Sequence, residues 1–592
     1  MWHYAPPLRD MRFVIEELLQ LPAQWARMPA FADLDADTAR QVLAEAGRFA
    51  SDVLAPTNAQ GDIEGCTLHG DGRVSTPAGF RQAYRAFVEA GWPSLACDAA
   101  VGGQGLPQLL NAVLFEMLCS ASHAWAMYPA LLNGAYETLH AHATPELRER
   151  VLPHIVSGQW LSTMCLTEAQ AGSDLGLVRT RAEPQADGSY ALHGSKIFIS
   201  GGDHDLTDNI VHLVLARIAG APAGSKGLSL FVALKWLQDG RRNDIVCTGL
   251  EHKMGIHGSA TCQLSFEGAT AWIVGEPGRG LAAMFVMMNA ARLHVAMQGL
   301  AHAELAHQNA LRYAHERLQM RAVVRPELRR QLGLDGVAPG PADPIALHPP
   351  MRLTLLRQRV LVEGARMIAY ETAHLLDVAE RSSDAAERAR AHGLVSLRTP
   401  VLKAYLTESG FAVASDALQV FGGHGYLRDW GIEQCLRDSR IAMIYEGTNE
   451  IQAMDLLLRK VLPDGGAAFG VLLDALHDEI PQGALHGGTA RGAIDALRAA
   501  LAPLVAAAAE DAELAHRVAA DFLRAAALVL LAQAWARADA VAQALHASDA
   551  VFHGAKRDSA LFFFDAVLPE LDLRLRLLAP KATLPLIDPP QA

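Results

Sequence analysis

The amino-acid sequence predicts an α+β protein that is mostly α-helical, with helical segments on both sides of a central β domain. Aromatic residues make up only 6% of the 592 residues, while Ala and Leu are abundant, a composition that favours helices. Between about residues 161 and 280 the pattern changes to short segments rich in β-branched and aromatic residues, which are typical of strands. A chain of this length exceeds one hydrophobic core and predicts roughly four domains.

Composition and charge exclude several classes of protein. Hydrophobic residues make up 51% and charged residues 19%, which argues against disorder. The net charge of −13 argues against a nucleic-acid partner. The seven cysteines are scattered without metal-ligand spacing, so we expect buried thiols, a reducing compartment and no metal. The start lacks a signal-peptide pattern, and the longest apolar run, Ala525–Ala536, is shorter than a bilayer span. We therefore expect a cytoplasmic protein with no integral membrane segment.

The first 160 residues are predicted to be helical. Residues 1–35 form a short N-terminal extension, in which Met11–Leu21 has helical periodicity. Residues 36–160 form an N-terminal α-helical domain, because Thr38–Val53 and Leu109–Ala121 have the apolar spacing of amphipathic helices.

A glycine-rich run at Gly102–Pro107 lies between two of these helices. A phosphate-binding loop would need a preceding strand and a following lysine, and the sequence offers neither clearly. We therefore predict a tight turn.

Residues 161–280 are predicted to form the middle β domain. Asp-Gly, Gly-Gly and Pro turns separate its strands, with no helix between them. Strands spaced this closely favour an antiparallel barrel or sandwich. The predicted strands are Tyr190–Ser200, Ile210–Ile218, Leu228–Trp236 and Thr261–Phe266.

Long Ala- and Leu-rich helices return in residues 281–462. Asp335–Pro350 interrupts them, and its five prolines and two glycines predict a surface loop. The predicted helices are Gly280–Arg317, Arg352–Arg381, Ala386–Phe421 and Asn449–Val461.

Residues 463–592 are predicted to form an extra C-terminal helical domain. Its Ala-rich helices are separated at Gly483–Gly488 and at Gly554. The segment holds 10 Lys and Arg against 16 Asp and Glu. Its apolar helices could pack on a dimer or bind a membrane or an oxidase, and the lack of a Lys/Arg-rich face favours packing.

The stretch Met443–Gln452 is the strongest candidate for catalysis. It places one carboxylate, Glu446, after apolar and aromatic residues and before a glycine and a new helical pattern. Partial desolvation raises the proton affinity of such a carboxylate, which suits a base that takes a proton from carbon. The stretch alone is equally compatible with a helix N-cap at Thr448 or Asn449 and a surface acid at Glu446.

Four other segments are rich in glycine, hydroxyl or amide groups. Each taken singly is more typical of turn or cap chemistry than of a binding site. They are Cys165–Asp174, Lys196–Gly202, Glu316–Gln319 and Gln419–Gly425.

The order of these pieces resembles the acyl-CoA dehydrogenase family over about residues 36–462. Helices precede Thr-Glu-x-x-Ala-Gly-Ser-Asp at Thr167–Asp174, and strands follow it. Then come Glu-Arg-x-Gln at Glu316–Gln319, Gln-x-Phe-Gly-Gly-x-Gly at Gln419–Gly425 and Tyr-Glu-Gly-Thr-Asn at Tyr445–Asn449. The resemblance implies a C-terminal four-helix bundle in residues 281–462, carrying the catalytic glutamate.

Further segments are similar to the larger bacterial subgroup of that family. They are Tyr4–Met11, His348–Arg352 and the C-terminal tail. That subgroup includes broad-range fatty acyl-CoA dehydrogenases and 3-methylmercaptopropionyl-CoA dehydrogenases. The acyl chain length that this protein prefers cannot be predicted from the sequence.

The resemblance implies a mechanism. Glu446 would remove the α-proton of an acyl-CoA thioester, and hydride transfer from the β-carbon to N5 of FAD would give the trans-2-enoyl-CoA. The backbone N–H of Glu446 and a ribityl hydroxyl of FAD would polarise the thioester carbonyl. The family's minority position for the base is Ala291 here, which cannot take a proton. Electron-transfer flavoprotein would accept the electrons.

The resemblance also implies the binding residues. Thr167 would bond the flavin pyrimidine, Ser200 the N5 region, and Phe198 stands where many relatives place Trp. Arg317 and Gln319 would hold the FAD pyrophosphate of a neighbouring subunit, which implies a homodimer. The residues expected at FAD are Cys165, Thr167, Gly172, Ser173, Phe198, Ser200, Arg317, Gln319, Gln419, Phe421, Gly422, Gly423 and Thr448. Those expected at the acyl-CoA substrate are Ser173, Asn289, Arg292, Tyr445 and Gly447.

Two points remain open at this stage. Glu450 stands where relatives often have an amide or a small residue, and near phosphates it would have to turn toward a ribose hydroxyl or solvent. Some relatives of this fold are flavin-binding, DNA-associated stress proteins with little dehydrogenase activity. That role needs a basic surface, which the acidic tail does not favour.

Overall fold

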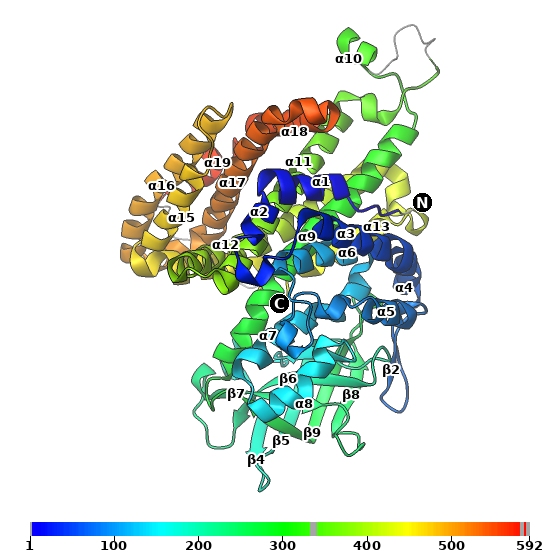
Figure 1. Ribbon diagram of the computed structural model, residues 1–592, viewed down its shortest axis with the longest axis vertical. Coiled ribbons are helices and arrows are strands. Elements are labelled where there is room, and N and C mark those ends of the chain that lie inside the picture. The colour runs from blue at the N-terminus through cyan, green and yellow to red at the C-terminus, as the bar shows by residue number, and fades with distance from the viewer. Residues whose placement is uncertain (1–2, 332–339, 580–584, 588–592) are drawn as a thin grey trace. The chain divides into compact units, whose positions relative to one another are not determined.

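The computed structural model describes residues 3–331, 340–579 and 585–587 (Figure 1). The chain divides into two compact units. Unit 1 comprises residues 1–392 and 406–446, and unit 2 comprises residues 393–405 and 447–592. Each unit is described by itself below, and the domain boundaries drawn from the sequence stay predictions.

Unit 1 begins with helices, as the sequence predicts. A representative case is α3, where the Asp35 carboxylate caps the helix by accepting the Thr38 N–H at 2.7 Å. The helices are α1 (Leu8–Arg12), continued by a π-helical turn (Phe13–Leu18), α2 (Leu21–Trp25), α3 (Ala36–Arg48), α4 (Asn58–Glu64), α5 (Phe80–Glu89), α6 (Gln108–Ala126), α7 (Leu132–His142) and α8 (Pro145–Val156).

The glycine-rich run before α6 is a tight turn, as predicted. Gly102 has φ +88°, and a Cβ on Gly103 would lie 2.0 Å from the Cys97 carbonyl oxygen. Only glycine fits this close approach, so packing explains the motif.

The N-terminal residues are more deeply integrated than a short extension would be. Tyr4, Met11 and Phe13 are buried, and Asp10 forms an ion pair with Arg366 of α11 (Pro349–Arg381). The buried Arg366 guanidinium also binds Glu116 and Glu304, each at 2.6 Å. Tyr4, Asp10, Met11 and Phe13 are therefore part of the core of unit 1.

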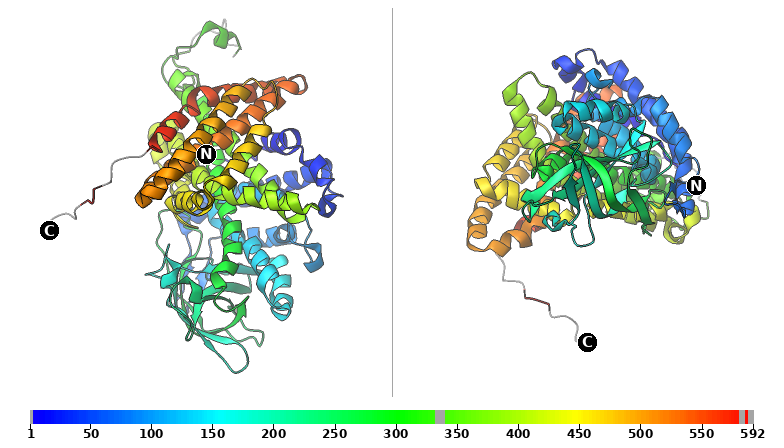
Figure 2. Two further views of the ribbon diagram at one scale, coloured as in Figure 1. Left: turned by 90° about the vertical axis from the view of Figure 1, so that its left-hand side faces the viewer. Right: turned by 90° about the horizontal axis from the view of Figure 1, so that it is seen from below.

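The β domain is a barrel, as predicted, but it is not purely antiparallel. Strands β6, β4, β5, β9 and β7 pair in that order, and β7 pairs back onto β6 to close the ring (Figure 2). The pairs β3–β6 and β4–β6 are parallel, because the long connections between these strands bring them back in the same direction. The strands are β3 (Trp160–Cys165), β4 (Arg181–Pro184), β5 (Tyr190–Ser200), β6 (Asn209–Ile218), β7 (Leu228–Leu234), β8 (Ile245–Leu250) and β9 (Thr261–Val274), with a separate hairpin of β1 (Thr67–Leu68) and β2 (Val74–Ser75).

The C-terminal helices of unit 1 pack around α9 (Gly280–Glu316), which contacts α6, α7 and α11. Gly299 of α9 and Gly410 of α12 (Ala385–Phe421) touch through their backbones, since a Cβ on Gly410 would lie 2.3 Å from the Gly299 carbonyl oxygen. Residues 393–405 of α12 belong to unit 2. The remaining helices of this region are α10 (Pro326–Gln331) and α13 (Ile432–Ser439). The loop predicted at Asp335–Pro350 lies partly outside the described residues, and its last two residues open α11.

Unit 2 is helical, as predicted, and is built around α17, which contacts α14, α16, α18 and α19. Gly554 does not separate two helices; it lies inside α18, where the flanking residues sustain the helix despite its cost. The elements are α14 (Asn449–Met454), a π-helical turn (Asp455–Val461), α15 (Ala467–Asp478), α16 (Gly487–Glu510), α17 (Ala512–Ala544), α18 (Ala550–Phe562), a second π-helical turn (Phe563–Val567) and α19 (Glu570–Leu577).

Three described helices, α9, α16 and α17, are long and apolar enough to cross a membrane by length and composition. The apolar stretch around Ala525–Ala536 is thus longer than the sequence analysis expected, because mean hydropathy over 18 residues tolerates Gln533. The most apolar stretches of α17 and α9 are 83% and 61% buried within the structure, against 28% for α16.

Candidate active site

Glu446 lies in a strained turn at the end of unit 1. Its φ is +56°, in the left-handed region, which costs a residue other than glycine about 1–3 kcal/mol. The side chain is half-buried. Strain of this kind persists only where the surroundings fix it, and it is concentrated at functional sites. Glu446 therefore differs from an ordinary surface glutamate in both its backbone conformation and its burial.

Residues that follow Glu446 are held within unit 2. The Thr448 side chain accepts the Ile451 N–H at 3.4 Å and caps α14, so the N-cap interpretation of this threonine is confirmed. The fully buried Lys403 ammonium donates to the Gly447 carbonyl at 2.7 Å and to Asn449 Oδ1 at 3.1 Å. Sequence reasoning missed Lys403, because a lysine on a helix gives no local sign of being buried.

Tyr445 is anchored within unit 1 by its hydroxyl. It donates to Gln298 Oε1, and it lies 3.3 Å from His123 Nε2 and 3.5 Å from Met127 Sδ. Burial, together with the nearby Cys119 and Glu446, raises the pKa of Tyr445 well above its usual value. The hydroxyl is therefore protonated and engaged by protein groups, so the ring is the part of Tyr445 left to contact a substrate.

The residues expected on the substrate side of α9 lie one turn apart. Arg292 is buried and its Nη1 lies 3.5 Å from Asn289 Oδ1, whereas Asn289 is exposed. Ala291 is buried and offers no acid beside them.

Three of the residues predicted at FAD meet at one edge of the barrel. The Ile197 N–H donates to the Thr167 carbonyl at 2.9 Å, which joins the end of β3 to β5. A bulge between Lys196 and Ile199 places Phe198 at φ +59° with 59% of its surface exposed. Ser200, two residues on, is half-buried. The bulge thus turns an aromatic ring outward between two hydroxyl residues.

The loop after β3 carries the other predicted residues of this region. Gly172 and Ser173 are exposed. The Cys165 side chain is fully buried beside Thr163 and His212, and burial raises its pKa to about 12. The Cys165 side chain is therefore a packing group of the barrel and not a surface ligand.

A buried ion pair that the sequence analysis did not single out holds this loop. Lys196 is 0% exposed and donates to Glu168 at 2.9 Å, while Glu168 also accepts from the Thr180 hydroxyl at 2.6 Å. Burial alone would raise the pKa of Glu168, but Lys196, Thr180 and the Arg179 N–H lower it to about 2. The feature of the sequence that could have indicated this ion pair is Lys196, a lysine among apolar residues of a predicted strand.

A second cluster forms at the C-terminal end of α9. Arg317 and Gln319 are exposed, and the Arg317 carbonyl accepts the Ile345 N–H at 2.8 Å. Tyr313, one turn before Arg317, stacks on Phe421 at 4.2 Å between ring centroids. Phe421 is therefore a packing residue, and it leaves the following glycines exposed beside the arginine. The exposed members are Arg317, Gln319, Gln419, Gly422 and Gly423.

Comparison with known proteins gives this arrangement its context. Profiles of the acyl-CoA dehydrogenase N-terminal, middle and C-terminal domains match residues 36–159, 163–269 and 340–461, and an acetyl-CoA dehydrogenase C-terminal-like profile matches 479–584. The chain is 43% identical over 488 residues to 3-methylmercaptopropionyl-CoA dehydrogenase of Ruegeria pomeroyi, covering 81% of this chain and 80% of that one. The chain belongs to the acyl-CoA dehydrogenase family.

Two further comparisons agree with this membership. The chain is 36% identical to a broad-specificity linear acyl-CoA dehydrogenase of Mycobacterium tuberculosis, over 82% of this chain and 80% of that one. An acyl-CoA dehydrogenase of Bacillus anthracis, solved in complex with FAD, shares the fold with a TM-score of 0.73 at 19% identity, over 96% of this chain and 91% of that one. The protein is a flavin-dependent acyl-CoA dehydrogenase.

The residues of this acyl-CoA dehydrogenase fit a flavin at the barrel edge. A flavin ring needs a flat apolar surface and hydrogen-bonding groups at its rim. The exposed Phe198 ring would supply the first, and Thr167 and Ser200 would supply the second. A Cβ on Gly172 would meet nothing within 4 Å, so the loop leaves room for a bound group.

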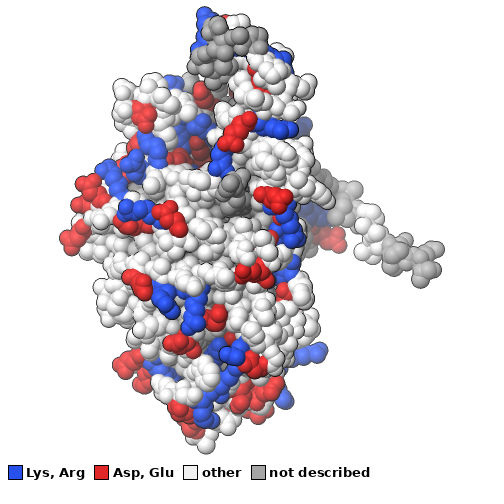
Figure 3. Space-filling view, turned by 90° about the vertical axis from the view of Figure 1, so that its right-hand side faces the viewer, with Lys and Arg blue, Asp and Glu red and all other residues white. Residues whose placement is uncertain are grey.

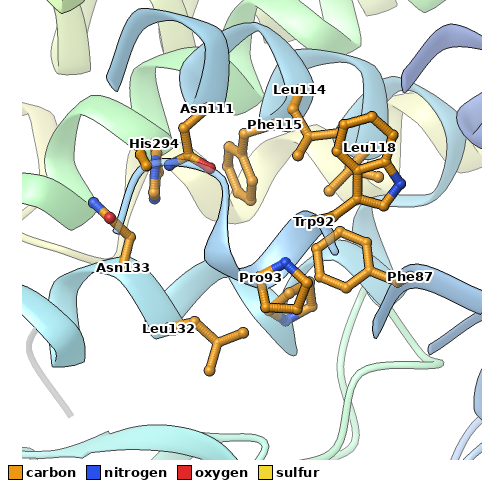
Figure 4. Close-up of a pocket in the computed structure, with 12 residues that line it drawn as sticks. Phe87, Trp92, Pro93, Asn111, Leu114, Phe115, Leu118, Leu132, Asn133 and His294 are labelled. Atoms are coloured by element: carbon orange, nitrogen blue, oxygen red, sulfur yellow. The ribbon is translucent and has the colours of Figure 1, made fainter. Parts of the chain in front are cut away.

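One small cavity of the acyl-CoA dehydrogenase contains none of the predicted site residues. Figure 4 shows it between α5, α6, α7 and α9, with Phe115 and His294 side by side; their rings lie 4.5 Å apart. His294 Nδ1 lies 3.3 Å from the Ala130 carbonyl, and burial lowers the pKa of His294 to about 4. The His294 side chain therefore contacts and stabilises the turn between α6 and α7.

The charges on one face of the molecule do not favour the DNA-associated alternative. On the face shown in Figure 3, Lys and Arg are interspersed with Asp and Glu, and they form no continuous basic field there. A nucleic-acid site would need such a field.

Proposed function

We propose that Glu446 is the base that removes the α-proton of an acyl-CoA thioester, which is converted to the trans-2-enoyl-CoA. The observation that carries the proposal is the left-handed turn of Glu446 directly after the anchored Tyr445. A carboxylate held in a half-buried turn has the fixed position that removal of a proton from carbon needs. Ala291 leaves no competing acid at the other position used in the family.

The backbone N–H of Glu446 is the group we propose for polarising the thioester carbonyl. A carboxylate cannot remove an α-proton unless the negative charge that develops on the carbonyl oxygen is stabilised. A backbone donor in a fixed turn is already oriented for that charge and needs no rearrangement during the reaction. Closure of the site over the acyl chain would exclude water and strengthen the interaction.

Thr167, Phe198, Ser200 and the exposed loop at Gly172 are the residues we propose to hold FAD at the barrel edge. FAD bound there supplies the hydride acceptor for the β-carbon. Electron-transfer flavoprotein is the proposed acceptor of the electrons.

A homodimer is part of the proposal. Glu316, the last residue of α9, lies 18 residues beyond Gln298, which is about 27 Å along the helix axis, and Arg317 follows it directly. In Figure 1, α10, which follows α9, and the β-strands of unit 1 lie at opposite ends of the picture. The cluster at Arg317 therefore suits the FAD pyrophosphate of a second copy of the chain.

The proposed substrates are linear acyl-CoA thioesters, with 3-methylmercaptopropionyl-CoA as the alternative. The names of the two relatives above support both. We also propose a cytoplasmic location and a role in fatty acid β-oxidation.

Glu446→Gln tests the function. The variant should bind FAD normally but lose bleaching of the flavin band near roughly 450 nm when mixed anaerobically with acyl-CoA. Wild-type protein mixed with short, medium and long acyl-CoAs and with the methylthio analogue ranks the substrates in the same assay. Glu450→Gln is the matched control, since Glu450 is exposed four residues on and should not be needed. Full bleaching by Glu446→Gln would refute the assignment.

A further inference from the structure

Behind Tyr445 runs a chain of hydrogen-bonding side chains that no step of the proposed reaction uses. His123 of α6 lies 2.9 Å from His302 of α9, measured from Nδ1 to Nε2. Cys435 of α13 lies 3.6 Å from His302 Nδ1. The imidazoles and the thiol are all buried, and so is Gln298 at the other end of the chain. Three helices of unit 1 thus converge on the residue before the proposed base.

One assignment of donors and acceptors satisfies the contacts between Tyr445, Gln298, His123 and His302. The Tyr445 hydroxyl donates to Gln298 Oε1, so its oxygen is available to accept from His123 Nε2–H at 3.3 Å. His123 Nδ1 then carries no hydrogen and accepts from His302 Nε2–H. His302 Nδ1 lies beside the Cys435 sulfur, whose S–H is directed at the His302 backbone carbonyl at 3.5 Å. In this assignment both imidazoles have the same neutral tautomer.

Burial keeps the chain in this state. It lowers the pKa of His123 to about 4, and burial together with His123 lowers the pKa of His302 well below its usual value. A proton added to His123 would place two N–H groups face to face at the His302 contact. Near neutral pH the chain is therefore intact.

Because Tyr445 is the residue directly before Glu446, its anchoring limits where the backbone of Glu446 can lie. The peptide plane between the two residues carries the Glu446 N–H, and the Tyr445 N–H is itself bonded to the Ile441 carbonyl at 3.2 Å. The Tyr445 hydroxyl is held by α6 and α9, so the residue before Glu446 is fixed at both its backbone N–H and its side chain. The left-handed φ of Glu446 follows directly on this fixed residue.

We propose that His123 and Gln298 are positioning residues, which hold Tyr445 so that Glu446 presents its carboxylate and backbone N–H to the substrate. The inference rests on the proposed role of Glu446. Misplacement of a reacting group by about 1 Å can lower a rate about 100-fold, so a fixed Tyr445 bears directly on turnover.

A matched pair of variants at His123 tests the proposal. Gln places its amide nitrogen where Nε2 was and keeps the donor to Tyr445, whereas Asn keeps a polar group toward His302 and loses that donor. We expect His123→Asn to lower kcat about tenfold with FAD content and KM unchanged, and His123→Gln to retain most of the activity. With α-deuterated acyl-CoA, the kinetic isotope effect should rise in His123→Asn, because proton removal becomes slower relative to the other steps.

Equal kcat in the two variants, or an isotope effect that stays at the wild-type value, would overturn the proposal. Gln298→Met removes the acceptor of the Tyr445 hydroxyl hydrogen and should reproduce His123→Asn. Loss of FAD from both His123→Asn and Gln298→Met would mean that the chain serves folding, and would also overturn it. Wild-type protein that fails to bleach with any acyl-CoA would instead refute the proposed function.

Discussion

At the scale of single residues, two of the five described non-glycine residues with a left-handed φ belong to the proposed site. Glu446 has φ +56° and Phe198 has φ +59°. One is the proposed base, and the other is the exposed ring at the proposed flavin edge. Both are fixed by neighbours, Tyr445 in one case and the β-bulge of β5 in the other. Backbone strain thus marks both halves of the proposed site.

Phe198→Ala should weaken FAD binding without unfolding the protein. The ring is 59% exposed, so it contributes little to the core, whereas aromatic packing on a flavin contributes about 1 kcal/mol. We expect the dissociation constant for FAD to rise up to about tenfold, measured by titration of the deflavinated protein. Phe198→Trp is the control and should bind FAD at least as tightly. Unchanged affinity in Phe198→Ala would place the flavin elsewhere.

At the scale of elements, the loop between β3 and β4 is shaped by one buried carboxylate. Glu168 accepts hydrogen bonds from Arg179 and Thr180 at the far end of the loop, and it pairs with Lys196 of β5. A loop with exposed glycine at Gly172 keeps its shape because both of its ends are tied to one side chain.

Glu168→Gln should be strongly destabilising. It leaves the Lys196 ammonium, which is 0% exposed, without its charge partner, and breaking a buried pair in this way costs about 3–5 kcal/mol. Urea unfolding followed by circular dichroism measures the loss. The double variant Glu168→Gln/Lys196→Met removes both charges and should recover part of the stability. A single variant as stable as the wild type would show that the pair is not desolvated in solution.

At the scale of the whole molecule, buried histidines make stability depend on pH. Burial lowers the pKa of His123, His294 and His374 to about 4, and of His204 and His212 to about 3. An unfolded chain takes up these protons below about pH 6.5, whereas the folded chain resists them until pH 4 or lower. The stability these groups contribute is complete above pH 6.5 and is lost as the pH falls toward 4.

Buried carboxyl groups act in the opposite direction. Burial raises the pKa of Asp377 to about 8 and of Glu137 to about 7, so protonation of these groups favours the folded state as the pH falls. The histidines are more numerous, and we expect the Tm to be lower at pH 5 than at pH 7 in differential scanning fluorimetry. His294→Gln should reduce the difference. A Tm that rises on acidification would contradict this balance.

Local sequence determined much of this protein. The pattern of β-branched residues located β5 and β6 to within a residue, and apolar spacing located α9, α11 and α12. The order of the motifs from Thr167 to Asn449 led to the family before any fold was known. These signals are local, because a strand or helix is specified by the pattern of residues that are neighbours along the chain.

Only the tertiary structure decided what holds the proposed catalytic residue. Gln298 and His123 meet Tyr445 from positions 147 and 322 residues away, and on their own helices they look like ordinary core residues. The closure of the barrel by β6 on β7, the parallel pairs of β6 and the burial of Lys196 and Lys403 were likewise absent from the local pattern. Periodicity reports which face of an element is apolar, but hydrogen bonds between distant side chains exist only once the chain has folded.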